Sequence, residues 1–284
     1  MGAINTDRLG IKLRQAAEAG NKARLKALLA DPACDPMSCC WWGSTALMHA
    51  AQNGHGSCVK LLLSVSDTGT KDNKGDTALI KAASAGHDAC VKLLLPVSNA
   101  LIQDNGGRNA LMWTVLHGHT SCTKLLIPAS DLLAHEENRM TALMLASFYG
   151  RCACVKLLLL KSNPLACNND GLNALMIASL HGHVSCVQLL LHVSNPLAQD
   201  NRGTTALMHA AMHGGLPCTK LLLPVSNVSD QDNMGMTSSA HARSAGQGPT
   251  ADLIDAYALS LSTHREISNF VGASMAKKSP TLRI

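Results

Sequence analysis

Cysteine and histidine are the residues whose chemistry first suggests a metal site or a nucleophile, since the 284-residue chain holds 11 cysteines and 13 histidines. Six of the cysteines recur at a constant interval of 32 residues: Cys58, Cys90, Cys122, Cys154, Cys186 and Cys218. Packed helices lie about 8–10 Å apart, so one cysteine per repeating unit leaves equivalent sulfur atoms too far apart for a disulfide. We expect these six thiols to be small core residues, kept reduced in a cytoplasmic compartment.

Five further cysteines fall outside this series: Cys34, Cys39, Cys40, Cys152 and Cys167. The chain has no Cys-x-x-Cys pair, so the spacing gives no support to a zinc site. Cys39 and Cys40 come just before an expected exposed tip and are the thiols most open to reaction. A thiol- or metal-dependent activity at these two residues is therefore an alternative to a purely structural interpretation.

The histidines form a second series, in which one residue follows a glycine at the same place in the period: His55, His87, His119 and His183. Catalysis by histidine needs an activated nucleophile and an orienting partner nearby. The sequence contains no Gly-x-Ser-x-Gly, P-loop or His-Glu-x-x-His motif, and we expect no intrinsic catalysis.

A period of 32 residues organises the whole chain. The segment Thr45-Ala-Leu-Met-His-Ala-Ala51 recurs in related form from Thr77, Asn109, Thr141, Asn173 and Thr205. A glycine, a Leu-Leu pair and a serine keep the same period, which gives six full repeats.

Each repeat predicts two short helices and a tip. Thr45 caps a first helix that ends at Gly54, where glycine readily takes the left-handed conformation. A second helix follows over about residues 57–63, and Asp-Asn-Lys-Gly at 72–75 is typical of a hairpin tip. Proline ends three of the second helices, at Pro96, Pro128 and Pro224.

Helix, turn, helix and tip at this period, carrying Thr-Ala-Leu-Met-x-Ala-Ala, Gly-His, Val-Lys-Leu-Leu-Leu and Asp-Asn-x-Gly, resemble the ankyrin repeat over roughly residues 10–260. The resemblance implies an all-α ankyrin-repeat solenoid in which the histidine after the turn glycine has a structural role. We expect a capping repeat at 1–42, six repeats at 43–235, a degenerate capping repeat at 236–262 and a tail at 263–284. Terminal repeats of a solenoid need a polar outer face, and both ends have one.

The repeats depart from the family pattern after the second helix, where serine replaces the usual glycine. We expect the next residue to supply the left-handed conformation instead. That residue is an aspartate or asparagine in every repeat: Asp67, Asn99, Asp131, Asn163, Asn195 and Asn227.

The resemblance also implies that a partner meets the concave face, formed by the tips and the last residues of the first helices. In the last four repeats these helix-end positions carry an apolar row beside a mostly histidine row. The residues are Leu116, His117, Phe148, Tyr149, Leu180, His181, Met212 and His213. At about 10 Å per repeat, such a stripe is long enough for an extended peptide. Charging of its histidines below pH about 6.5 is expected to weaken binding.

Trp41 and Trp42 occupy the tip before the first full repeat, where later repeats have Asp-Asn-x-Gly. The chain has only three Trp, two Tyr and two Phe, so these positions concentrate its aromatic residues. Exposed aromatic residues are enriched in binding hot spots. An alternative is that the two tryptophans cover the gap against the N-terminal cap.

Charge and hydropathy give little support to nucleic acid or membrane as the partner. The net charge is +5, and the basic residues are scattered or form one exposed lysine in five of the six repeats (Lys60, Lys92, Lys124, Lys156 and Lys220). No apolar run approaches the roughly 20 residues of a membrane span. The first residues do fit the myristoylation pattern at Gly2, which would provide a membrane anchor.

The sequence therefore predicts a cytoplasmic protein-interaction scaffold with no cofactor and no small-molecule substrate. Two alternatives stay open. One is the thiol- or metal-dependent activity at Cys39, Cys40 or the histidine row, and the other is an accessory subunit that gives specificity to an enzyme on another chain.

Overall fold

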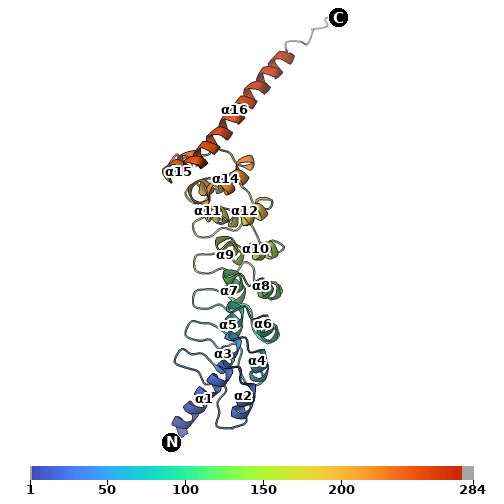
Figure 1. The fold of residues 1–284 in the computed structure, drawn as a ribbon, viewed down its shortest axis with the longest axis vertical. Coiled ribbons are helices and arrows are strands. Elements are labelled where there is room, and N and C mark those ends of the chain that lie inside the picture. Colours follow the sequence, from blue (N-terminus) through green and yellow to red (C-terminus); the bar gives the residue numbers. More distant parts are fainter. Residues whose placement is uncertain (1, 277–284) are drawn as a thin grey trace. The chain divides into compact units, whose positions relative to one another are not determined.

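The computed structural model describes the backbone of residues 2–276 and the side chains of residues 8–213 and 215–263 (Figure 1). This part of the chain is all-α, and its extended pairings are isolated bridges such as that between Gln103 and Asn109. Among the helices it contains, none combines the length and the apolar character that crossing a membrane would require. Residues 277–284 of the expected tail lie outside the described residues, and Gly2 is described in its backbone fold alone.

Contacts divide the chain into two compact units, Met1–Asn169 and Asp170–Ile284. In the first unit, the first helices of successive repeats pack in one row and the second helices in another, with the tips projecting beside the first row (Figure 1). The first helices of the six repeats are α3 (Ala46–Gln52), α5 (Ala78–Ser84), α7 (Ala110–His117), α9 (Ala142–Phe148), α11 (Ala174–Leu180) and α13 (Ala206–His209). The second helices are α4 (Gly56–Leu62), α6 (Asp88–Leu94), α8 (Thr120–Leu126), α10 (Cys152–Leu158), α12 (Val184–Leu191) and α14 (Gly215–Leu222).

The first helices begin and pack as the sequence predicts. Thr45 Oγ1 accepts a hydrogen bond from the Met48 amide, and equivalent caps open the other five helices. Leu47, Ala50 and Ala51 are fully or almost fully buried, so the small residues let neighbouring helices approach closely. The second helices pass into short 3₁₀ turns where proline follows, at η1 (Leu95–Val97), η2 (Ile127–Ala129) and η4 (Leu223–Val225).

A histidine joins each of the first repeats to the one before it. The His87 Nε2 atom lies 3.0 Å from the carbonyl oxygen of Gln52, at the end of the preceding first helix. Its ring packs on Gly54, where an added Cβ would lie 2.6 Å from Nδ1. His55 and His119 make the same contact with Glu18 and Ser84. The structural role that the resemblance implies is thus a clasp between consecutive repeats, hereafter the histidine clasp.

The fourth repeat replaces the histidine of the clasp by arginine. Arg151 Nε donates to the carbonyl oxygen of Leu116 over 3.2 Å, and its side chain packs on Gly118. A longer, charged side chain therefore fills the same place.

Asparagines link consecutive tips. Asn73 donates from its backbone amide to the Trp42 carbonyl and from Nδ2 to the Trp41 carbonyl, over 3.0 and 3.1 Å. Asn105 does the same to the tip of Asn73, and in the second unit Asn233 bonds to that of Asn201. These bonds hold each tip against its neighbour.

The expectation of a left-handed aspartate or asparagine after the periodic serine is wrong. Among the described residues outside glycine, Arg139 alone has a positive φ, at 56°. The Asp and Asn side chains instead accept a hydrogen bond from the amide two residues on, as Asn99 Oδ1 does from Leu101 at 2.9 Å. This Asx turn reverses the chain without a left-handed residue, because the side-chain oxygen replaces a backbone acceptor.

The sixth repeat also departs from the expected pattern. Its first helix closes through a π-helical turn, η3 (Ala210–Gly214), and Gly215, which follows this turn, has a φ of 67°. Gly215 stands where the other repeats have the clasp residue, so this repeat has no side chain to form one. The extra glycine allows the turn to shift by one residue.

Two helices form each end of the described chain. At the N-terminus these are α1 (Gly2–Glu18) and α2 (Lys22–Leu29), and at the C-terminus α15 (Ser238–Ser244) and α16 (Gly248–Ala276). Leu13, Ala16 and Ala17 of α1 are buried. Helix α16 continues through the expected boundary at residue 263.

Candidate protein-binding face

The two tryptophans at the first tip are the most exposed aromatic residues described. Trp41 is 90% exposed and Trp42 is 69% exposed, although hydrogen bonds from Asn73 fix their backbone. Their indoles therefore do not cover the gap against the N-terminal cap. They form an apolar projection into solvent on a tip whose backbone is hydrogen-bonded to the next one.

In the first unit, the predicted contact row occupies the ends of α7 and α9. Phe148 and Tyr149 are 39% and 40% exposed, and their rings meet edge to face at 4.9 Å between centroids. Leu116 is half-buried and His117 is exposed, with its imidazole stacked on Trp113 at 5.7 Å. Leu116 is thus less accessible to a partner than the aromatic pair, which is exposed.

In the second unit, each pair of the predicted row consists of a half-buried residue and an exposed one, as Leu116 and His117 do. Leu180 and Met212 are half-buried, whereas His181 and His213 are exposed. Met212 lies in the π turn η3, not in a regular α-helix. Leu180, Met212 and His213 line a hollow of about 270 Å³ beside the tip residue Asp200.

Two histidines of the row, His117 and His181, have a lowered pKa. Burial lowers the pKa of His117, and the nearby His119 and Arg151 lower it further. Burial likewise lowers the pKa of His181, with added effects of His183 and His213. Charging of these two imidazoles therefore moves below the ordinary value near 6.5.

A contact that the sequence interpretation missed joins tip and first helix in four repeats. A tip aspartate binds a donor nine residues later: Asp72 to Lys81 and Asp104 to Trp113, both at 2.8 Å, Asp200 to His209 at 2.9 Å, and Asp232 to His241 at 2.8 Å. Where the tip residue is Glu136 or Asn168, the position nine residues on is apolar. This covariation between repeats was a readable signal.

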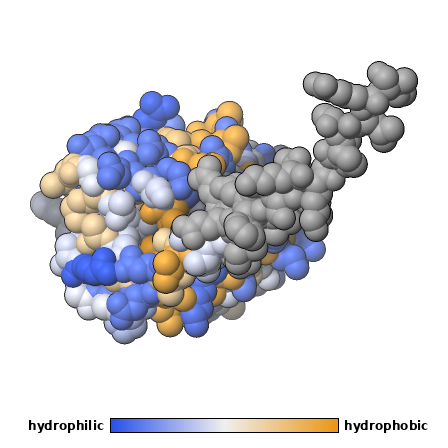
Figure 2. Space-filling model, turned by 90° about the horizontal axis from the view of Figure 1, so that it is seen from above, coloured by the Kyte–Doolittle hydropathy of each residue, from blue (hydrophilic) through white to orange (hydrophobic). Residues whose placement is uncertain are grey.

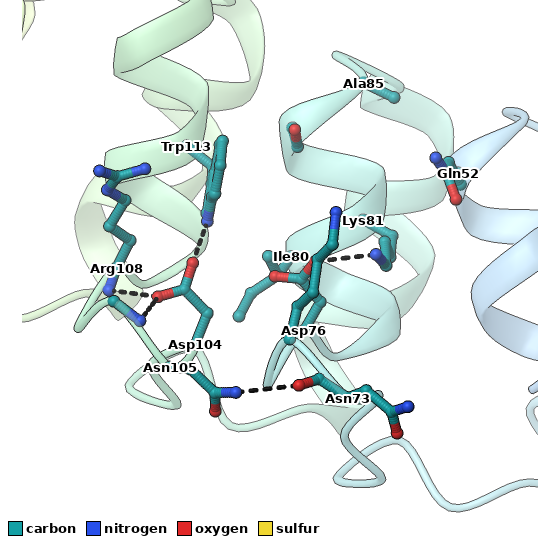
Figure 3. A pocket seen from close by; sticks show the side chains of 13 residues that line it. Gln52, Asn73, Asp76, Ile80, Lys81, Ala85, Asp104, Asn105, Arg108 and Trp113 are labelled. Atoms are coloured by element: carbon teal, nitrogen blue, oxygen red, sulfur yellow. Dashed lines mark hydrogen bonds and ion pairs between the residues drawn. The ribbon is translucent and has the colours of Figure 1, made fainter. Parts of the chain in front are cut away.

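The tips and first helices of the first unit enclose a groove of about 680 Å³. Asn73, Lys74, Asp104 and Asn105 of the tips form one side, and residues of α5 and α7 form the other (Figure 3). Trp113 and Lys81 project into the space between tips and helices (Figure 3). Next to this groove, a hollow of about 410 Å³ is lined by Trp42, Cys40 and His49, and it shares Gln52, Asn73, Lys74 and Lys81 with the groove.

Lys81 is a half-buried cation of the groove that pairs with two carboxylates. Its ammonium lies 2.8 Å from both Asp72 Oδ2 and Asp76 Oδ2. Burial raises the pKa of Asp72, but the hydrogen bonds from Lys81 and from the Asp76 and Lys74 amides outweigh it and lower the pKa below the ordinary value. The Asp72 carboxylate is thus held ionised with the help of a cation of the protein itself.

The cysteines divide as the periodicity predicts. All eleven are free, and the six periodic thiols are buried. Cys39 is exposed and Cys40 is half-buried, but Cys167 is exposed as well. Among the described residues, no three His, Cys, Asp or Glu side chains are grouped so that they could hold a metal ion.

The surface of the protein seen from above is mixed in character. In this view, hydrophobic residues reach the surface among hydrophilic ones (Figure 2). The periodic lysines Lys60, Lys92, Lys124, Lys156 and Lys220 are all exposed on the second helices, as expected for a solvated outer face.

Comparison with known proteins shows which family these repeats match. The sequence matches the family described as ankyrin repeats (3 copies) in five overlapping segments, residues 13–100, 97–166, 129–200, 153–234 and 175–255. It is similar to cortactin-binding protein 2 of Ornithorhynchus anatinus, with 46% identity over 55 residues, or 19% of this chain and 3% of that protein. The chain thus spans only a small fraction of that relative's length.

A solved structure shows the same fold. The ankyrin repeat domain of human ASB11 superposes with a TM-score of 0.67 over 76% of this chain and 97% of that one, at 24% identity. Its likeness extends to the fold alone. Together with the family match over residues 13–255, it shows that this chain belongs to the ankyrin-repeat family.

Proposed function

We propose that this protein binds another protein through the concave ankyrin face, as a scaffold, adaptor or inhibitor without catalysis of its own. Ankyrin repeats are in general protein-interaction modules, which supports the class of function. The contact residues we propose are the tip tryptophans Trp41 and Trp42 and the helix-end pairs of the last four repeats. Those pairs are Leu116/His117, Phe148/Tyr149, Leu180/His181 and Met212/His213.

The observation that carries this proposal is the exposure of Trp41 and Trp42, at 90% and 69%. Large aromatic side chains held in water are enriched where another protein buries them, because burial gains about 25 cal/mol per Å² of apolar surface. The Asn73 hydrogen bonds keep this tip ordered before binding, so little backbone entropy is lost on association.

The experiment is a pull-down from a lysate of the source organism under reducing conditions. Wild type is compared with Trp41→Ala/Trp42→Ala and with Phe148→Ala/Tyr149→Ala. A matched control is Leu160→Ala, which removes a side chain that is 80% exposed just after the second helix α10. Circular dichroism checks that each variant is folded.

We expect a partner that wild type and the Leu160 variant retain and that the two aromatic variants lose. Loss of a hot-spot aromatic costs about 2 kcal/mol or more, equivalent to roughly 30-fold in affinity. Equal recovery by all four proteins would show that the partner binds elsewhere, and the face we propose would then be wrong.

A further inference from the structure

The groove between the tips and α5 and α7 contains carboxylates that are already used by the protein. Asp104 Oδ1 accepts hydrogen bonds from the Gly106 and Arg108 amides, and its Oδ2 accepts one from Trp113 Nε1. Asp72 and Asp76 share Lys81. The second oxygen of Asp76, Oδ1, is buried and so is not presented to the groove. These acids therefore offer little to a ligand.

Two other cations that line the groove, Arg108 and Lys74, are not engaged as Lys81 is. Arg108 donates no side-chain hydrogen bond within the described structure, and its Nε is buried without an acceptor. Its one ion pair, to Glu136, is 3.7 Å long, beyond hydrogen-bond distance. Lys74 is exposed on the tip and has no ion pair among the described residues. Among the charged residues that line this groove, those without a hydrogen-bonded partner are thus cations.

Arg108 is also oriented for a ligand before one binds. Its guanidinium carbon lies 5.2 Å from the centre of the Trp113 ring, and Trp113 is itself fixed by its bond to Asp104. Figure 3 shows the arginine and the indole standing together at one end of the groove. A guanidinium held on an aromatic ring presents a flat set of N–H donors that matches a carboxylate in two parallel hydrogen bonds.

We propose that this groove receives an extended acidic segment of a partner protein, with one Asp or Glu carboxylate on Arg108 and a second near Lys74. The inference rests on the proposed function and names the chemistry of its partner. The hollow beside the groove, walled by Trp42, takes an apolar side chain of the same segment. An extended strand suits the site because the tips and helices form a channel that crosses repeats.

The test starts by selecting random linear peptides, displayed on phage, against the immobilised full chain. A selected peptide is then synthesised with a fluorescent label, beside a version in which every Asp and Glu is replaced by Asn and Gln. Fluorescence anisotropy measures the affinity of both peptides for wild type and for Arg108→Gln/Lys74→Gln. The matched control, Lys92→Gln/Lys124→Gln, removes the same two charges from exposed positions on the second helices.

We expect the selected peptides to be enriched in Asp and Glu. Wild type and the control should bind the acidic peptide alike, while the Arg108/Lys74 variant and the amide peptide should each lose about 10-fold or more in affinity. Binding should also weaken as NaCl rises from about 0.05 to about 0.5 M, because salt screens exposed charges.

Three results would overturn the inference: selected peptides without acidic enrichment, equal binding by the Arg108/Lys74 variant, or a phosphorylated peptide bound where its Glu version is not. None of these touches the proposed function as long as Trp41→Ala/Trp42→Ala still abolishes capture of the partner in the pull-down. Failure of both experiments together would remove the concave face as the site.

Discussion

Replacing Gly54 by alanine should destabilise the protein through two separate effects. Gly54 has a φ of 75°, a conformation that costs a residue with a Cβ about 1–2 kcal/mol. The new methyl would also lie 2.6 Å from His87 Nδ1 and 2.8 Å from Cε1, so the ring must move. Movement breaks its 3.0 Å contact with the Gln52 carbonyl, a hydrogen bond worth about 0.5–1.5 kcal/mol.

Together these effects predict a loss of about 1.5–3.5 kcal/mol for Gly54→Ala, measured as the free energy of unfolding in urea. Gly246 provides the matched control, because its φ is 73° but an added Cβ would meet nothing within 4 Å. Gly246→Ala should therefore show the conformational cost alone.

A double-mutant cycle separates the clasp from any difference in location between the two glycines. His87→Ala in the Gly54→Ala background should cost little or even restore stability, because the contact is already broken and the clash is relieved. If the free-energy changes of the two substitutions are strictly additive, the claim that the His87 ring packs in the space left by the missing side chain of Gly54 is refuted.

Two further predictions concern titration and thiol chemistry. Burial lowers the pKa of His209 more than its bond to Asp200 raises it, so the unfolded chain binds more protons between the lowered pKa and the ordinary value near 6.5. The free energy of unfolding should therefore fall as the pH is lowered through about 6.5. Urea unfolding of His209→Leu should show a shallower fall with pH than that of wild type. The same dependence on pH in both proteins would contradict this. In the folded protein a maleimide should label Cys39 and Cys167 within minutes, but spare Cys122, whose pKa burial and Asp88 raise to about 12, until urea is added. Peptide mass spectrometry reads the sites, and early labelling of Cys122 would show that its helix opens.

Much of the fold could be predicted from the sequence because each repeat states the same local rules. Thr45 and its equivalents cap, Gly54 and its equivalents reverse the chain, and the prolines after the second helices end them. These are short-range effects, and repetition confirms them several times in one chain. The left-handed conformation predicted after the periodic serine was wrong, because aspartate and asparagine suit an Asx turn as well as a left-handed residue.

The site was harder to predict because its chemistry depends on contacts across the repeat. The exposure of Trp41, Trp42, Phe148 and Tyr149 followed from their position in the period, and the structure agrees. The groove cations Lys74 and Arg108 look like ordinary surface charges in the sequence. That they have no hydrogen-bonded carboxylate becomes visible only when the partners of each neighbouring carboxylate are known.

The histidine clasp bears on how a protein of this kind changes its length in evolution. Each clasp reaches one repeat back and no further, as His119 does to the Ser84 carbonyl and Gly86. Deleting residues 77–108 as one block would bring Asn109 after Asp76, and His119 would then meet Gly54 and the Gln52 carbonyl, which are the same groups. A gene that gains or loses whole multiples of this unit therefore keeps a complete set of contacts, whereas a partial deletion leaves a glycine facing the wrong residue. Selection can in this way adjust the number of repeats without redesigning any one of them.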